Sequence, residues 1–175
     1  MFILSKPVIL LNGPSSSGKS TLGRALQAMI QERKNERFGL VSIDDCMKLA
    51  VDEVIYEDDV FEINPDLCEK ALCELKYAAG VIIDHVITSE RIYTQLTEAL
   101  KPYALIRVKV TCPPDELQRR ENARGDRHPG SAQASYTWLY PKDGYDLTVD
   151  TYAMTTAQCA DIIFAELEKR TAKPH

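Results

Sequence analysis

The chain reads Gly13-Pro14-Ser15-Ser16-Ser17-Gly18-Lys19-Ser20, which matches the pattern G-x-x-x-x-G-K-[ST]. This spacing lets backbone N–H groups wrap around a polyphosphate, and the two glycines permit the close approach and the backbone angles that wrapping requires. Lys19 is placed to reach the β- and γ-phosphates, and the Ser20 hydroxyl is placed to ligate Mg²⁺. The stretch therefore predicts a nucleoside-triphosphate site. Its expected nucleotide contacts are Gly13, Ser15, Ser16, Ser17, Gly18, Lys19, Ser20 and Thr21.

Such a loop must follow a strand and open a helix, and the neighbouring sequence predicts both. Residues 7–11 are a short apolar run typical of a buried parallel strand. After the loop, apolar residues recur at helical spacing: Leu22, Ala25, Leu26, Met29 and Ile30. The helix would add its positive N-terminal end to the phosphate site. The alternative is a glycine- and serine-rich turn between two core elements, and the agreement of strand, loop and helix argues against it.

Size and composition predict one globular domain over residues 1–175. The chain has 175 residues, of which 45% are hydrophobic and 27% are charged. A net charge of −5 gives no general attraction to nucleic acid or anionic membranes. The five cysteines form no C-x-x-C pair, so we expect reduced thiols in a cytoplasmic protein. We expect no signal segment, no membrane span and no zinc site.

Strand and helix patterns alternate along the chain, which predicts a parallel sheet covered by helices on both faces. Four further strands are expected, at residues 40–43, 81–83, 104–110 and 147–149. A helix is expected to start at Pro65 and to end at Gly80 as its C′ residue. The last helix is predicted by a capping-box pattern at Thr155 and Gln158.

Two predicted strands end in carboxylates, Asp44-Asp45 and Asp84. Ligands of open parallel sheets bind outside the carboxyl ends of the strands, where the phosphate loop also lies. Phosphoryl transfer to a hydroxyl needs a carboxylate that accepts the proton of the acceptor and another that holds Mg²⁺. Asp44 suits the role of the base, and Asp84 together with Ser20 suits the metal site. Asp45 suits either a helper carboxylate or a helix cap. Capping of the next helix remains the alternative for each aspartate.

Residues 113–146 are predicted to form a lid over the nucleotide. Proline and acidic residues at 113–116 open a helix, Gly125 closes it, and a long connection follows. The region carries a cluster of arginines: Arg119, Arg120, Arg124 and Arg127. Arginine suits bidentate phosphate contacts, so we expect Arg120, Arg124 and Arg127 to bind the nucleotide as the lid closes and excludes water. The alternative is a surface helix with salt bridges to Asp115, Glu116 and Glu121.

The same connection is rich in aromatic residues, and their role has two interpretations. Tyr136, Trp138, Tyr140 and Tyr145 either stack on adenine and line an acceptor pocket, or pack the lid onto the core. His85 follows a buried strand, which favours a packed or hydrogen-bonded core residue over a catalyst.

The chain resembles the chloramphenicol phosphotransferase-like proteins, a family of small P-loop kinases, over nearly its whole length. The matching segments are Ile9-Leu10-Leu11-Asn12-Gly13, residues 15–20, Asp44, Val81-Ile82-Ile83-Asp84, Ala123-Arg124-Gly125-Asp126-Arg127, Gly130 and Tyr145-Asp146-Leu147-Thr148-Val149-Asp150-Thr151. The resemblance implies a P-loop NTPase fold of the nucleoside-kinase type with a five-stranded parallel sheet. It also implies transfer of the ATP γ-phosphate to an alcohol, with Asp44 as base and Arg124 and Arg127 in the lid.

The resemblance departs at two places. Leu139-Tyr140 stands where family members commonly have Val-His, and residues 45–65, which should border the acceptor, match poorly. Three hypotheses follow. The first is a small-molecule kinase that uses ATP and Mg²⁺, with Lys19, Asp44 and Arg127 as catalytic residues. The second is a kinase for nucleotides or other anionic acceptors, and the third is a nucleotide-binding regulator. The acidic residues 44–66 argue against an anionic acceptor, and the presence of Asp44 and Asp84 argues against a regulator. The expected partner is a hydroxyl-bearing drug or metabolite; the sequence predicts no oligomeric state.

Overall fold

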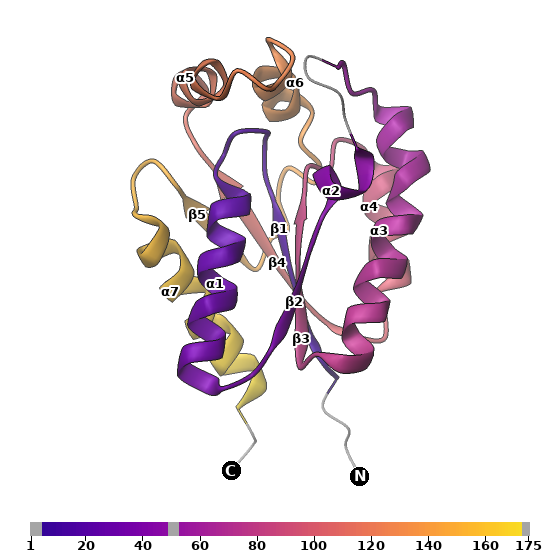
Figure 1. Cartoon of the computed structure of the whole chain (residues 1–175), viewed down its shortest axis with the longest axis vertical. Coiled ribbons are helices and arrows are strands. Elements are labelled where there is room, and N and C mark those ends of the chain that lie inside the picture. The colour runs from indigo at the N-terminus through magenta and orange to yellow at the C-terminus, as the bar shows by residue number, and fades with distance from the viewer. Residues whose placement is uncertain (1–4, 49–52, 173–175) are drawn as a thin grey trace.

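The computed structural model describes residues 5–48 and 53–172 (Figure 1). Its strands form one five-stranded parallel sheet in the order β2-β3-β1-β4-β5. The strands are β1 (Pro7–Asn12), β2 (Phe38–Ser42), β3 (Gly80–His85), β4 (Ala104–Thr111) and β5 (Leu147–Asp150). The helices are α1 (Lys19–Lys34), α2 (Ile43–Met47), α3 (Glu57–Tyr77), α4 (Glu90–Ala99), α5 (Pro114–Arg124), α6 (Ser131–Trp138) and α7 (Thr156–Thr171). The predicted α/β P-loop fold, including all five strands, is confirmed.

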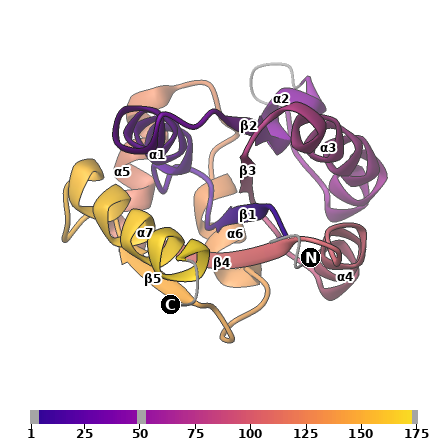
Figure 2. The same cartoon turned by 90° about the horizontal axis from the view of Figure 1, so that it is seen from below.

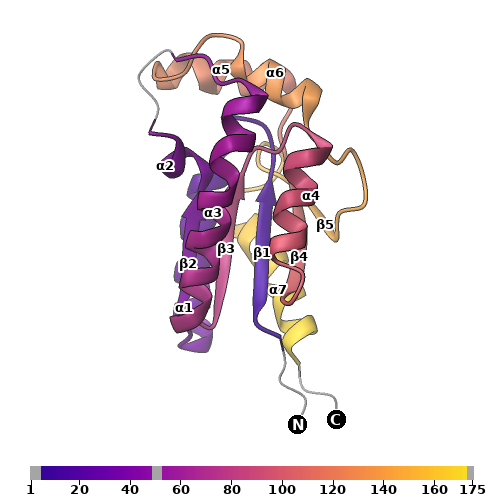
Figure 3. The ribbon, with the colours of Figure 1, turned by 90° about the vertical axis from the view of Figure 1, so that its right-hand side faces the viewer.

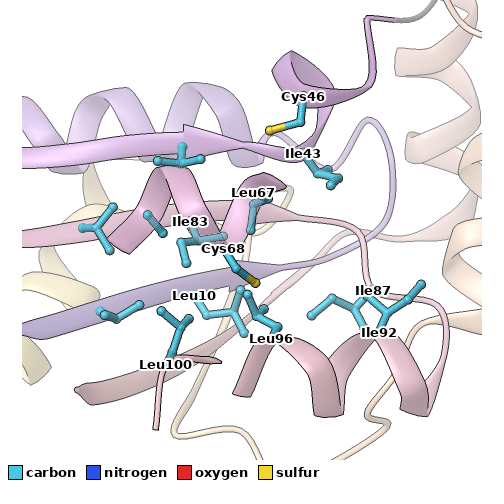
Figure 4. Close-up of a cluster of buried hydrophobic side chains, with 14 of the residues drawn as sticks. Leu10, Ile43, Cys46, Leu67, Cys68, Ile83, Ile87, Ile92, Leu96 and Leu100 are labelled. Atoms are coloured by element: carbon cyan, nitrogen blue, oxygen red, sulfur yellow. The ribbon is translucent and has the colours of Figure 1, made fainter. Parts of the chain in front are cut away.

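The central strand β1 is apolar along its length because both of its faces are covered. Val8 and Leu10 pack in the cluster beneath α3 and α4, whereas Ile9 and Leu11 pack in the cluster beneath α1 and α7. Figure 2 shows these two helical layers on opposite faces of the sheet. Figure 4 shows the α3 and α4 side, where Leu10 lies among helical side chains such as Leu96. The phosphate loop therefore directly follows a strand that is packed by helices on both faces.

Helix α3 begins at Glu57, so the predicted start at Pro65 is wrong. Pro65 lies inside the helix. The first turn carries three acidic residues, which favour the positive end of a helix. The predicted end is also wrong, because α3 ends at Tyr77 and Gly80 is the first residue of β3. A Cβ at Gly80 would lie 2.5 Å from the Phe38 ring, so this glycine serves close packing of β3 against β2.

Helices α5 and α6 lie over the carboxyl end of the sheet (Figure 3). The predicted helix up to Gly125 is confirmed, and Gly125 has a left-handed φ of 68°. The connection expected after it contains a further helix, α6. Buried Glu121 of α5 accepts hydrogen bonds from the backbone N–H groups of Gly130 (3.1 Å) and Ala132 (2.7 Å). This carboxylate satisfies donors at the start of α6 and joins the two helices into one unit.

The predicted capping box of the last helix is also present. Thr155 Oγ1 accepts from the Gln158 N–H, and the Gln158 side chain accepts from the Thr155 N–H. None of the described helices has the length and apolar character that a membrane span requires.

Candidate active site

The phosphate loop is shaped by close contact with strand β4 and by left-handed backbone angles. A Cβ on Gly13 would lie 2.2 Å from the carbonyl oxygen of Val110, so only glycine fits there. Gly18 at the start of α1 has a φ of 88°, and Ser16 has a φ of 68°. Alternation of such angles turns successive N–H groups to one side and forms a concave anion site. The loop thus has the backbone form that the sequence pattern predicts.

Lys19 is buried at the floor of this loop. Its ammonium group donates to the Pro14 carbonyl oxygen at 2.7 Å and lies 3.3 Å from Ser17 Oγ. Burial lowers the pKa of Lys19 below its usual range, and the charges of Asp84 and Asp44 oppose this shift. A lysine desolvated in this way gains much from an anionic partner, which a bound phosphate would supply.

Asp84 and Ser20 lie side by side at the loop. Parallel pairing sets Asp84 of β3 beside Leu11 of β1 and Ser42 of β2. The Ser20 hydroxyl donates to Asp84 Oδ2 at 2.7 Å, and Ser42 Oγ lies 3.4 Å from the same oxygen. A hydroxyl and a buried carboxylate are oxygen ligands of the kind that Mg²⁺ takes when phosphates complete its shell. The donors fit a magnesium ion, and its binding here stays a prediction.

A cavity of about 410 Å³ extends from these groups and has the expected lining of a phosphate site. Several predicted nucleotide contacts line it: Ser15, Ser16, Gly18, Lys19, Ser20, Thr21 and Arg124. Asp44 and Asp84 also line it, together with Arg24, which the sequence analysis did not single out. The spacing of Arg24, one helical turn after Ser20, is the signal that would have indicated it. We refer to this space as the phosphate cavity.

A second cavity, of about 550 Å³, adjoins the phosphate cavity. Ser15, Asp44 and Val86 line both spaces. The second cavity is bounded by α2, by residues 53–57 and by α6, and much of its lining is apolar, for example Val54 and Trp138. It is wide enough for a small molecule. We refer to it as the second cavity.

The lid arginines have separate partners. Arg127 forms an ion pair with Asp44, with 2.5 Å between Nη2 and Oδ2, and its side chain is only 13% exposed. Arg124 lines the phosphate cavity and pairs with Asp126 at 3.1 Å. Arg120 instead contacts the back of the loop, where its guanidinium donates to Ser17 O at 3.4 Å. It also donates to Thr151 Oγ1 (3.0 Å), Thr151 O (3.1 Å) and Glu116 (2.8 Å). Direct nucleotide contact by Arg120 therefore stays a prediction, and its observed partners belong to the chain itself.

Two of the four aromatic residues have the predicted packing role, a third lines a cavity, and contact with adenine or an acceptor stays a prediction. Tyr145 accepts a hydrogen bond from Asn12 Nδ2 and donates to the Pro141 carbonyl oxygen, and Tyr140 packs edge-on against Tyr93. These two tyrosines attach the connection to the core. Trp138 lines the second cavity and is 68% exposed, as expected for a residue at its mouth.

His85 is a buried, hydrogen-bonded core residue, as predicted. Its Nε2 lies 2.9 Å from Asn64 Oδ1. Burial lowers its pKa to about 3, so the ring is neutral at physiological pH.

A family model of chloramphenicol phosphotransferase-like proteins matches residues 6–168. The chain belongs to this family. A search of curated protein sequences finds no match.

Solved structures of P-loop kinases share the fold. The APS kinase CysC of Mycobacterium tuberculosis, solved with AMPPNP and APS, has a TM-score of 0.71 at 16% identity, covering 94% of this chain and 99% of that one. A gluconokinase from Sinorhizobium meliloti has a TM-score of 0.66 at 15% identity, covering 97% and 99%. Shikimate kinase from Acinetobacter baumannii has a TM-score of 0.65 at 18% identity, covering 98% and 97%. At these identities the likeness concerns the fold, and family and fold together indicate a P-loop phosphotransferase.

Proposed function

We propose that this protein transfers the γ-phosphate of ATP to a hydroxyl group of a small molecule. The observation that carries the proposal is the position of Asp44, which lines both the phosphate cavity and the second cavity. An acceptor in the second cavity would meet the phosphate at this carboxylate. A base at that point can take the hydroxyl proton while the acceptor oxygen bonds to phosphorus and ADP leaves.

The remaining residues have roles that follow from their charge and position. Arg127 holds the Asp44 carboxylate through their ion pair. Lys19 and Arg124 provide positive charge at the phosphate cavity, which suits the charge of a transferring phosphoryl group. Ser20 and Asp84 would hold Mg²⁺, which would offset the negative charge of the phosphates when bound.

The lining of the second cavity favours a neutral or cationic acceptor with an apolar part. Val54, Ile55 and Trp138 offer apolar surface, and Glu53 and Glu57 add negative charge. Two basic side chains, Arg127 and His128, also line the cavity, and Arg127 is already paired with Asp44. A nucleoside monophosphate would have to compete with Asp44 for this arginine. Chloramphenicol is a reasonable first acceptor because of the family, and other hydroxyl-bearing drugs and metabolites fit the same description.

The test is an ADP-release assay with Mg-ATP across hydroxyl-bearing antibiotics and metabolites, with mass detection of the phosphorylated product. We expect Asp44→Asn to lower turnover by about 10²- to 10⁴-fold, the usual contribution of a general base, while nucleotide binding persists. Asp45→Asn is the matched control, because Asp45 is the exposed neighbour and lines neither cavity, and it should retain activity. Full activity of Asp44→Asn would overturn the assignment of the base. Tight nucleotide binding without any product would favour a nucleotide-binding regulator.

A further inference from the structure

Ser135 of α6 joins the lid to the phosphate loop. The backbone N–H of Ser15 donates to Ser135 Oγ at 2.9 Å, and Ser135 Oγ donates to the Ala132 carbonyl oxygen at 3.0 Å. Ser135 is only 8% exposed. Ser15 lines both cavities and Ser135 lines the second. One hydrogen bond thus connects the loop that would hold the nucleotide with the helix that borders the acceptor space.

The Ser15 N–H has two possible acceptors. N–H groups of such a loop are the donors that bind phosphate oxygens. A hydrogen bond to a charged oxygen is roughly twice as strong as one to a neutral hydroxyl. A phosphate oxygen that reaches Ser15 would therefore displace Ser135 from this donor.

The loss of that bond would act on the middle of α6. The start of the helix is held by Glu121 through the Ala132 N–H. The chain just beyond its end is held by the Tyr140 N–H, which donates to the Ile87 carbonyl oxygen at 2.9 Å. Ser135 lies between these two attachments, and Ala134 and Trp138 on the same helix line the second cavity. A change at Ser135 would thus alter the wall of the second cavity.

We propose that Ser135 is a positioning residue that couples occupation of the phosphate loop to the shape of the acceptor cavity. Nucleotide takes the Ser15 N–H, Ser135 is released, and α6 moves its side chains at the second cavity. This coupling rests on the proposed function, because it takes the loop as the nucleotide site and the second cavity as the acceptor site.

The chain carries its own probe of α6. Trp138 is its one tryptophan and lies one turn after Ser135. Titration of the full-length protein with Mg-AMPPNP, followed by calorimetry and by tryptophan emission, reports nucleotide affinity and the state of α6 separately. In the wild type we expect the nucleotide to change the emission of Trp138.

The variant Ser135→Ala removes the competing acceptor. We expect it to bind Mg-AMPPNP about two- to tenfold more tightly, the range that one ordinary hydrogen bond represents. Its emission without nucleotide should resemble that of the nucleotide-bound wild type. If Ser135 had a merely structural role, its substitution would weaken nucleotide binding instead. The direction of the change in affinity therefore distinguishes the two roles.

The matched control is Thr137→Val on the same helix. Thr137 Oγ1 donates to the Gln133 carbonyl oxygen at 2.9 Å, and the residue is exposed and does not line either cavity. It should leave affinity and emission unchanged. Ser135→Thr keeps the hydroxyl and should behave as the wild type does.

Amide hydrogen exchange of the wild type tests the coupling without any variant. Residues 131–138 should exchange faster with Mg-AMPPNP than without it, because α6 is released. Slower exchange, or equal or weaker nucleotide binding by Ser135→Ala, would overturn the coupling while the proposed kinase activity stands. Absence of nucleotide binding to the wild type would overturn both.

Discussion

Gly13 lies so close to strand β4 that no side chain can be added there without moving the backbone. The nearest atoms to an added Cβ would be the carbonyl oxygen of Val110 at 2.2 Å and Ser17 Oγ at 3.1 Å. The first neighbour is strand backbone, which cannot turn aside as a flexible side chain can. The phosphate loop can therefore pack this closely against β4 only because Gly13 has no Cβ.

Gly13→Ala should destabilise the protein by about 1–3 kcal/mol, the usual cost of overpacking, and should weaken nucleotide binding because the loop must shift. Urea denaturation and calorimetry with Mg-ATP measure the two effects. Gly144→Ala is the comparison, because Gly144 has a φ of 81° and an added Cβ there would have open space around it. That variant should lose only about 1–2 kcal/mol through backbone strain and should keep its nucleotide affinity. Equal nucleotide affinity in both variants would contradict this account of Gly13.

The sequence could predict the positions of some residues of the candidate site but not of others. Lys19, Ser20 and Asp84 were predictable because a local motif and a strand end determine their positions. Asp44 was placed by the same strand-end logic, but its partner Arg127 lies far along the chain. Ser135 carries no local signal, because its hydrogen bond to Ser15 exists only after the lid packs on the loop.

At the scale of the element, α5 carries two arginines one helical turn apart that reach different neighbours. Arg120 contacts Ser17 O of the phosphate loop and Thr151 after β5, whereas Arg124 lines the phosphate cavity. Arg120 thus joins the lid helix, the loop and the end of β5. An i,i+4 spacing predicts a shared helical face, and it does not determine which neighbour each guanidinium reaches.

Arg120→Lys should lower the melting temperature and weaken nucleotide binding several-fold, because an ammonium group cannot replace the planar fork that reaches both Thr151 oxygens. Thermal unfolding and calorimetry with Mg-ATP measure these effects. Arg119→Lys is the matched control on the same helix, since Arg119 also pairs with Glu116 but is 68% exposed. We expect no change in that variant. Equal behaviour of the two variants would show that the contacts with Thr151 contribute nothing.

Two helices were misjudged from the sequence, and the structure shows the contacts that stabilise each of them. The helical stripe of α3 extends upstream of Pro65 through Asn64, a polar residue that is fully buried because it bonds to His85 and Gln95. The start of α6 is capped by Glu121 from another helix. The partners of Asn64 and the cap of α6 are distant in sequence, so local propensity and periodicity could not indicate them. The first turn of α3 does carry a local signal, because Asp59 accepts a hydrogen bond from the Tyr56 N–H at 2.9 Å.

At the scale of the whole molecule, a buried polar network ties the sheet to the helical layer on one face. His85 at the end of β3 lies 2.9 Å from Asn64 Oδ1, and Asn64 Nδ2 donates to Gln95 Oε1 of α4 at 2.7 Å. The network thus connects β3, α3 and α4 just below the phosphate loop, whose Gly13 N–H donates to the His85 carbonyl oxygen at 3.4 Å. Burial lowers the pKa of His85 to about 3. A neutral imidazole is therefore part of the native state.

The stability of the protein should fall as the pH drops below about 6.5, where the unfolded chain takes up a proton at His85 and the native state does not. This contribution is complete above pH 6.5 and decreases toward pH 3, with a slope approaching about 1.4 kcal/mol per pH unit. Glu57, whose pKa the Arg91 guanidinium lowers to about 2, loses its contribution only below about pH 4.5. Urea denaturation between pH 4.5 and 6.5 therefore separates the contribution of His85 from that of Glu57. His85→Gln keeps an N–H donor for Asn64 but cannot titrate, so its stability should vary less over this interval. An unchanged slope in that variant would place the pH dependence elsewhere in the molecule.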